Sequence, residues 1–386
     1  MSEVRVNNLS NENNTGGPTI SGITTYSGRH FIVPPQGTTA ERPEDCEPGS
    51  LRFNTDTAHL EYFRGNTIGW VEIEASSPEL GGGTGSNENA LGARAIAGGG
   101  FLGVRTIEFV TVSTFGDSQD FGDLTAAGAI HGKQAVATET RMLFSGGYIN
   151  NAIEFITVAS TGDAIDFGDL TERKYGETGV NDTIRGIFCG GASTTPFVPS
   201  HGGVTNVVDY VTIAQTGNAV DFGDLVHTGF PGASMNSTTR GIIARQNGPV
   251  GPNAIMDTII TRTLGNATDF GDCVSGTGSN VAGGACNATR GILAGGYLHN
   301  IIQYITMATL GDATDFGDLL VTQNNLRAAS SKTRGLILGG ATPSNSNVIE
   351  SVQIATTGNS IDFGDMAYVG GDVGQVTCNS NAHGGI

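Results

Sequence analysis

The sequence predicts an all-β protein: a six-bladed β-propeller closed by the C-terminal strand, preceded by a small β-meander module. The tetrapeptide Asp-Phe-Gly-Asp occurs six times at intervals of 46, 55, 48, 46 and 47 residues, and a regular period near 50 marks a repeat architecture. Each repeat holds four short runs of strand-forming residues, as a propeller blade does. The stretch from Cys378 to Ile386 matches that from Cys286 to Leu293, so the C-terminus can complete the first repeat, whereas an open solenoid would leave two exposed edges.

Composition favours short strands joined by tight turns. Of 386 residues, 60 are Gly, and only 15% are charged. The formal net charge of −18 argues against nucleic acid or an anionic membrane as a partner. The polar first residues and the lack of an 18-residue apolar run lead us to expect neither a signal peptide nor membrane insertion.

The five cysteines are scattered and form no CxxC pair, which argues against a zinc site and against a disulfide scaffold. Cys286 and Cys378 fall at positions that we predict to be equivalent in the repeat, where a small buried residue is the simplest interpretation. We therefore predict no metal and no cofactor.

We divide the chain into three segments with different compositions. Their bounds are 1–75 for a docking or oligomerisation module, 76–88 for a Gly/Ser linker and 89–386 for the repeats. The module should contain three strands, at 50–53, 59–63 and 70–74. A meander this small buries little apolar surface, so we expect it to lean on copies of itself or on another protein.

Two interpretations exist for the repeated Asp-Phe-Gly-Asp motif. Its carboxylates are hard oxygen ligands that could bind a cation. The structural interpretation is stronger, because one Phe per blade explains packing between blades and Gly permits close backbone approach. The motifs begin at Asp120, Asp166, Asp221, Asp269, Asp315 and Asp362.

An arginine also recurs once per repeat, in what we predict to be the turn between the first and second strands. We place the Asp motif at the turn between the third and fourth strands, on the same face of the propeller. The sequence therefore predicts a structural ring of Arg–Asp contacts, with six independent surface arginines as the alternative. The arginines are Arg94, Arg141, Arg185, Arg240, Arg290 and Arg334, and we place His383 at a seventh equivalent position.

The opposite face carries the variable loops after the second and fourth strands, where ligand-binding residues concentrate. The longest loop runs over 192–206. Exposed aromatic side chains there could stack on sugar rings, although packing on their own blade explains each of them equally well. The candidates are Tyr148, Lys174, Tyr175, Phe197, His201, Phe230, Tyr297 and His299.

The repeat unit resembles kelch-type repeats, with a Gly pair ending the second strand before an aromatic-containing strand. It departs from them in lacking their Trp and in using Asp-Phe-Gly-Asp. The stretch DYVTIAQTGNAVDFGDL, from Asp209 to Leu225, resembles kelch-like segments in structural proteins of marine bacteriophages, notably cyanophages. The stretch from Pro48 to Ile73 is similar to a short module near the N-termini of phage tail, fibre and virion proteins. These resemblances cover roughly 45–386 and imply a virion setting.

We therefore expect a non-enzymatic virion structural or appendage protein. Residues 1–75 would dock onto other virion proteins, with homo-oligomerisation, and the propeller would bind a host-surface glycan or protein. A purely structural decoration subunit is one alternative. A carbohydrate-active enzyme is the other, but His131, His201, His227 and His299 stand singly at non-equivalent positions, unlike a copper site, and no pair of carboxylates is singled out as in a glycosidase. We predict no catalytic residue.

Overall fold

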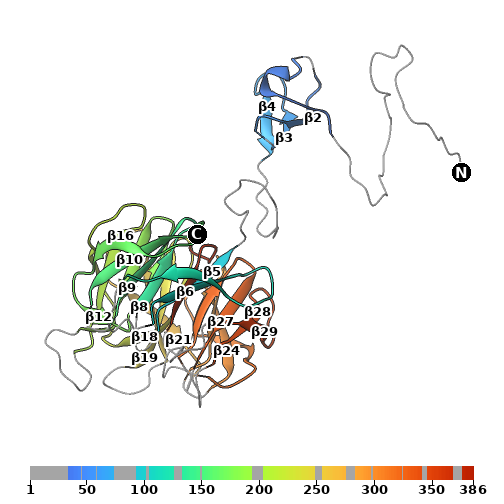
Figure 1. The fold of residues 1–386 in the computed structure, drawn as a ribbon. Coiled ribbons are helices and arrows are strands. Elements are labelled where there is room, and N and C mark those ends of the chain that lie inside the picture. Colours follow the sequence, from blue (N-terminus) through green and yellow to red (C-terminus); the bar gives the residue numbers. More distant parts are fainter. Residues whose placement is uncertain are drawn as a thin grey trace, which may run out of the picture. The chain divides into compact units, whose positions relative to one another are not determined.

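The computed structural model describes residues 34–44, 46–57, 59–73, 93–100, 104–125, 133–147, 150–193, 203–247, 254–274, 283–296, 299–323, 325–340, 346–367 and 376–386. The chain divides into two compact units, residues 1–77 and 78–386, called here the N-terminal module and the repeat unit (Figure 1). The predicted linker 76–88 lies outside the described residues. No helix in the described ranges has the length and apolarity needed to cross a membrane.

The N-terminal module is one four-stranded sheet in the order β1-β2-β3-β4. Three strands form the predicted antiparallel meander, shifted by at most one residue at their ends. A two-residue strand that pairs in parallel with β2, and a single 3-10 turn, were not predicted. The elements are β1 (Gln36–Gly37), η1 (Thr39–Glu41), β2 (Leu51–Asn54), β3 (His59–Phe63) and β4 (Trp70–Ile73).

The repeat unit is all-β, and its described residues form six four-stranded antiparallel sheets plus one short strand pair. Sheets 1 to 3 comprise β30 (Thr377–Ser380), β5 (Arg94–Gly98), β6 (Thr106–Thr111) and β7 (Gln119–Asp123); β8 (Lys133–Ala137), β9 (Arg141–Gly146), β10 (Ala152–Thr157) and β11 (Ile165–Asp169); and β13 (Thr178–Asn181), β14 (Arg185–Cys189), β16 (Val207–Thr212) and β17 (Val220–Asp224). The short pair is β12 (Lys174–Tyr175) with β15 (Ala192–Ser193).

Sheets 4 to 6 repeat the same order along the chain. They comprise β18 (Phe230–Asn236), β19 (Arg240–Asn247), β20 (Ile255–Ile260) and β21 (Thr268–Asp272); β22 (Gly283–Cys286), β23 (Arg290–Ala294), β24 (Ile301–Thr306) and β25 (Thr314–Asp318); and β26 (Arg327–Ser330), β27 (Arg334–Leu338), β28 (Val348–Gln353) and β29 (Ile361–Asp365).

The C-terminal strand β30 pairs with β5 and completes sheet 1, so the two ends of the repeat unit share one sheet. The predicted equivalence of Cys286 and Cys378 is wrong. Cys286 pairs with Gly291, the residue after Arg290. In sheet 1 the residue after Arg94 is Ala95, and it pairs with Ser380, so Ser380 is the equivalent of Cys286. The tail is therefore shifted by two residues from the sequence match, because the pairing follows the arginine and not the cysteine.

The hydrophobic core lies between neighbouring sheets. The first strand of each sheet lies beside the first strands of two other sheets, in the order β30, β8, β13, β18, β22, β26 and back to β30. Six separate apolar clusters fill the six junctions between sheets. The motif phenylalanines Phe121, Phe167 and Phe222 and their equivalents are buried in these clusters. Burying each such ring contributes about 1.5–3 kcal/mol.

Candidate functional site

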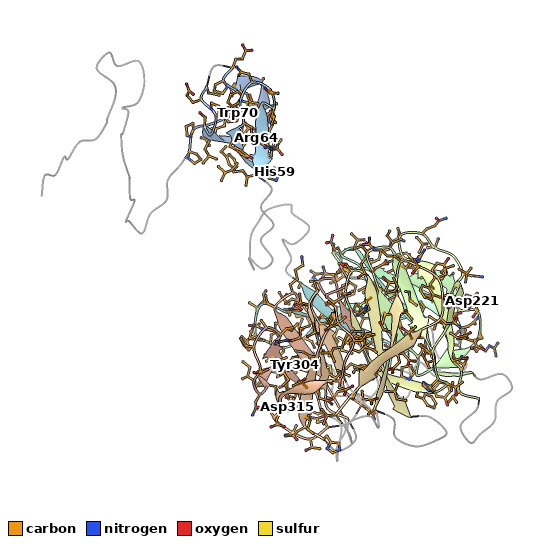
Figure 2. All side chains as sticks on the ribbon, turned by 180° about the vertical axis from the view of Figure 1, so that it is seen from behind. His59, Arg64, Trp70, Asp221, Tyr304 and Asp315 are labelled. Atoms are coloured by element: carbon orange, nitrogen blue, oxygen red, sulfur yellow. The ribbon has the colours of Figure 1, made fainter. Side chains whose placement is uncertain are left out.

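The Asp-Phe-Gly-Asp motif forms the fourth, outermost strand of each sheet, not a turn as the sequence suggested. In sheet 1, Ile107 pairs with Gly122 whereas Glu108 pairs with Asp120, so Phe121 is the extra residue of a β-bulge. The same irregularity occurs in the other five sheets. Figure 2 shows Asp221 and Asp315 near the outer edge of the repeat unit.

Hydrogen bonds join each motif strand to the turn that precedes the next motif strand. At the first junction, the Gly162 N–H donates to the Phe121 carbonyl (2.7 Å) and the Ala164 N–H donates to the Asp123 carbonyl (2.8 Å). The Asp123 N–H donates back to Asp163 Oδ1 at 3.0 Å. Equivalent contacts recur at every junction, with the side-chain acceptors Asp163, Asn218, Asn266, Asp312, Asn359 and Asp117. The motif therefore fastens adjacent sheets through its backbone.

The motif glycine is required by this contact. Gly122 has φ +149°, and a Cβ atom there would lie 2.4 Å from the carbonyl oxygen of Gly162 in the neighbouring sheet. Any other residue would combine a strained backbone with a clash against another backbone. The first motif aspartates are exposed, so their side chains do not explain the junction.

The recurring arginines lie at the first position of the second strand, and the predicted Arg–Asp ring is wrong. Within the described residues, no ion pair joins a motif aspartate to one of these arginines. Each guanidinium instead donates to a backbone carbonyl of the next sheet. The acceptors, from Arg94 to Arg334 in order, are Val158, Ile213 with Ala214, Thr261, Met307, Ile354 with Ala355, and Val112.

Five of these guanidinium groups also stack on an aromatic ring. The guanidinium carbon of Arg290 lies 4.5 Å from the ring centre of Tyr304, and that of Arg94 lies 4.6 Å from Phe109. In two sheets the aromatic position of the third strand holds a polar residue, Thr258 or Ser351. Arg334, in the sheet with Ser351, stacks instead on Phe115 and Phe363, whereas no ring contact of this kind involves Arg240 among the described residues. A half-buried cation–π contact of this kind adds about 0.5–2 kcal/mol.

Sequence reasoning missed a third repeated feature. In each of the six sheets, the third strand carries an acid or amide side chain at the same position. These side chains are all buried, and most accept a hydrogen bond from the chain leaving the preceding motif strand; Glu154 accepts from the Thr125 N–H at 2.9 Å and Glu350 from the Leu320 N–H at 3.0 Å. The available signal was an acid flanked by apolar residues at a fixed distance from the motif. The six are Glu108, Glu154, Asp209, Asp257, Gln303 and Glu350.

Two of these acids are paired with buried lysines: Lys133 and Glu154 both belong to sheet 2, whereas Lys174 belongs to β12, which follows sheet 2, and Asp209 belongs to sheet 3. Lys133 Nζ lies 3.4 Å from Glu154 Oε1, and Lys174 Nζ lies 2.9 Å from Asp209 Oδ2. Burial lowers the pKa of the Lys133 ammonium against the opposing charge of Glu154. Nearby, burial raises the pKa of Glu177 to about 7. This buried charged cluster is the strongest candidate for chemistry among the described residues, because perturbed titratable groups mark functional sites.

The predicted ligand-face residues do not converge on one site. Lys174 is a correction, since its side chain is fully buried rather than exposed in a loop. Tyr175 and Phe230 are half-buried and face each other with ring centres 5.8 Å apart. His299 is half-buried. Tyr148, Phe197, His201 and Tyr297 lie outside the described residues.

The first strands of the six sheets border a small cavity. This cavity of about 30 Å³, lined by residues of these strands, admits only water-sized molecules. His383 is not a seventh member of the arginine set. It is buried at this cavity with Nε2 2.9 Å from the Ala137 carbonyl, and its Nδ1 accepts the Gly385 N–H. Burial lowers the pKa of His383 to about 4, so the imidazole is neutral at pH 7.

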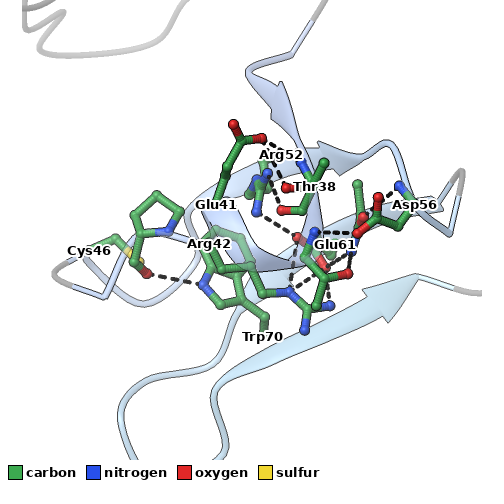
Figure 3. A network of polar contacts seen from close by, with 11 residues as sticks. Thr38, Glu41, Arg42, Cys46, Arg52, Asp56, Glu61 and Trp70 are labelled. Carbon is green, nitrogen blue, oxygen red and sulfur yellow. Dashed lines mark hydrogen bonds and ion pairs between the residues drawn. The ribbon is translucent and has the colours of Figure 1, made fainter.

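The N-terminal module buries a charge network on one sheet face (Figure 3). Glu61 is fully buried, and it accepts hydrogen bonds from Arg42 (2.6 Å) and Asn54 (3.3 Å) while Arg52 Nη1 lies 3.2 Å away. Burial favours a raised pKa for Glu61, but Arg42, Asn54 and Arg52 outweigh it and hold the pKa below its usual value. Trp70 closes this face by donating to the Pro43 carbonyl at 3.2 Å.

The opposite face of the same sheet is apolar and partly open. The pairing register places Leu51 opposite Tyr62, Phe53 opposite Leu60, and Leu60 opposite Ile73, so alternation puts these side chains and Val71 on one face. Leu51 is 47% exposed, Leu60 38% and Ile73 40%. Among the described residues of the three meander strands, none on this face is charged.

In comparisons with known proteins, no model of a protein family matches the chain, and no curated protein is found to be similar. Among the described residues, no group of three or more His, Cys, Asp or Glu side chains is arranged to hold a metal ion. The resemblances drawn from the sequence therefore stay expectations.

Proposed function

We propose that the six sheets are the blades of a closed, six-bladed, kelch-like β-propeller spanning about residues 89–386. Two observations support this proposal. The first strands of the sheets neighbour one another in a cycle that returns to its start. The C-terminal strand β30 completes the sheet of the first repeat, and shared terminal strands protect the edges that an open array exposes.

The function that we propose for the chain is that of a bacteriophage virion structural or appendage protein. Residues 1–75 attach it to other virion proteins and assemble copies of it, and the propeller is displayed to bind a host-surface glycan or protein. The proposal assigns the chain no enzymatic activity. Purely structural decoration is the second candidate, which the binding assays below separate from host recognition.

The observation that carries the proposal is the inverted burial in the N-terminal module. An isolated soluble sheet places its apolar face inside, yet here the covered face holds Glu61 and Arg52 while Leu51, Leu60 and Ile73 are exposed. Contiguous exposed apolar surface on a soluble protein marks an interaction site. The short resemblance of this segment to phage virion modules fits an attachment role.

The test compares the full chain with a Leu60→Glu variant, which places a charge at the centre of the apolar face. We expect wild-type protein to sediment as an oligomer and to be detected by mass spectrometry in purified particles, and the variant to lose both properties. Leu310→Glu, at a 61% exposed position in the repeat unit, is the matched control. Equal sedimentation and equal incorporation of all three proteins would refute the attachment role.

Host recognition is tested separately with the same full-length protein. We expect it to adsorb to host cells or to bind a subset of a glycan array, with binding reduced by Tyr175→Ala, which removes one partner of the Tyr175–Phe230 ring pair. Incorporation into particles without any adsorption would favour structural decoration. Turnover of a glycan would favour the carbohydrate-active alternative.

A further inference from the structure

The side chains of Lys174 and Asp209 lie at ion-pair distance, but they are not aligned for a hydrogen bond. Lys174 Nζ lies 2.9 Å from Asp209 Oδ2, and both side chains are 0% exposed. Despite this distance, Oδ2 has no hydrogen-bond partner, because the approach of the ammonium fails the geometry of a hydrogen bond. The amine and the carboxyl group are therefore in contact, desolvated and not locked into a conventional ion-pair geometry.

The other oxygen of this carboxyl group is held in place. Thr171 Oγ1 donates to Asp209 Oδ1 at 2.6 Å. A donor on one oxygen polarises the carboxyl carbon and favours addition of a nucleophile to it. Oδ1 is thus the oxygen that is retained in any acyl transfer, and Oδ2 is the one that faces the amine.

A third titratable group completes the arrangement. Glu177 is buried, with Oε1 accepting from Ser145 Oγ at 3.1 Å and Oε2 without a hydrogen-bond partner in the described part of the chain. Burial raises the pKa of Glu177 to about 7, although the positive charge of Lys174 opposes the shift. A carboxyl group of this kind can take up or release a proton at neutral pH.

We propose that Lys174 and Asp209 condense to form an intramolecular isopeptide bond. The Nζ–Cγ bond forms and the Cγ–Oδ2 bond breaks. An ammonium and a carboxylate become a neutral amide and one water, so atoms and charge balance without an oxidant, a reductant or another reactant. Glu177 takes a proton from the ammonium, which frees the amine lone pair, and delivers it to Oδ2. After the Nζ–Cγ bond has formed, Glu177 transfers a second proton from the nitrogen to Oδ2, so that this oxygen leaves as water and Glu177 returns to its starting state.

The physical driving force is the removal of two buried charges. A desolvated ion pair repays its desolvation only with good geometry and further hydrogen bonds, and this pair lacks the alignment. The bond would join β12, which follows sheet 2, to β16 of sheet 3. A covalent link between distant segments also restricts the unfolded chain, as a disulfide does.

The second buried lysine provides an internal control. Lys133 Nζ contacts Glu154 Oε1 at 3.4 Å in hydrogen-bond geometry, and the backbone of Thr125 also donates to Glu154. This pair is longer and already aligned as a hydrogen bond. We therefore assign condensation to Lys174 and Asp209 alone.

The test is the intact mass of the purified full chain under denaturing conditions. We expect a mass lower than the sequence mass by one water, and a tryptic branched peptide that joins Lys174 to Asp209. Lys174→Arg should restore the full mass, Glu177→Gln should leave most molecules at the full mass, and Lys133→Arg should keep the loss of water. A wild-type chain at its full sequence mass would overturn the proposal, as would fragmentation that places the link at Lys133.

Discussion

The N-terminal module and the repeat unit stabilise small four-stranded sheets in opposite ways. In the repeat unit, apolar side chains fill the space between each sheet and its two neighbours. In the module, a single sheet buries Glu61 with Arg52 and leaves Leu60 exposed. The difference follows from the number of neighbours: a sheet with neighbours on both faces can be apolar on both, whereas in the described part of the module one short segment covers one face.

This contrast separates stability from attachment. The repeat unit is held together by six equivalent junctions, so each single contact contributes only a small part of its stability. The module depends on a few charge-assisted contacts around one carboxylate, and its apolar surface is left for a partner. Variants can therefore weaken one unit without the other, and the following predictions are ordered from the largest expected effect.

Replacing a motif glycine should damage the repeat unit most. For Gly122→Ala we expect a loss of about 4 kcal/mol in unfolding free energy, because the strained backbone and the clash with Gly162 both cost energy. Gly162→Ala is the matched control, since Gly162 has φ +154° but open space around its Cβ position. Denaturant unfolding of both variants isolates the clash. If the two variants lose the same stability, backbone contact between sheets is not what the motif provides.

Neutralising Glu61 should unfold the module alone. Glu61→Gln leaves Arg52 buried without a full countercharge, which costs about 3 kcal/mol and exceeds what so small a sheet can lose. Hydrogen exchange read by mass spectrometry should show faster exchange over 46–73 and unchanged exchange over the repeats. Glu44→Gln, at an exposed position, serves as the control. Faster exchange in both units would contradict their independence.

Features that recur as the same residue type in every repeat could be predicted from the sequence, whereas recurring contacts with the backbone could not. The period and the burial of Phe121 were accessible because a large apolar residue at regular intervals implies packing. The partners of the arginines were not, because a backbone carbonyl such as that of Ile354 leaves no mark in residue identity. An aspartate was the natural guess, and it was wrong.

The buried lysine was misplaced for a related reason. Lys174 lies between the chain segments of sheets 2 and 3, so sequence reasoning put it in an exposed loop, but the structure places it in the short strand β12, and its partner Asp209 belongs to sheet 3. The module was easier to predict, because its strands are consecutive and their turns are local. Its inverted faces were not predicted, since alternation alone does not say which face a distant segment covers.

Acidification should change the stability of the two units over different pH ranges. The unfolded chain protonates His383 near pH 6.5 but the folded protein only near pH 4, so this group removes about 3 kcal/mol of stability as pH falls through that window. Glu177, with its raised pKa, acts in the opposite direction between about pH 7 and 4.5. In the module, the folded state lowers the pKa of Glu61, so protonation of this group reduces the module's stability only below about pH 4.5.

Comparison with a His383→Asn variant isolates the histidine from Glu177. The variant should be less stable than wild type at pH 7, because the contacts with Ala137 and Gly385 are altered. Its deficit should shrink as pH falls toward 4.5, as measured by chemical unfolding at each pH. A deficit that stays constant over this range would show that His383 is not the titrating group.

The smallest expected effect concerns the arginines and tests whether each junction depends on the ring as well as on the carbonyl. Arg290→Ala removes hydrogen bonds to Ile354 and Ala355 and the stacking on Tyr304, whereas Arg240→Ala removes one bond to Met307 and no stacking. We expect losses of about 2 and about 1 kcal/mol, respectively, in thermal unfolding. In a Tyr304→Leu background, the stability loss caused by Arg290→Ala should fall toward that caused by Arg240→Ala. Equal losses for the two arginines would mean that the carbonyl contact alone joins the sheets, and the aromatic position would then serve packing within its own sheet.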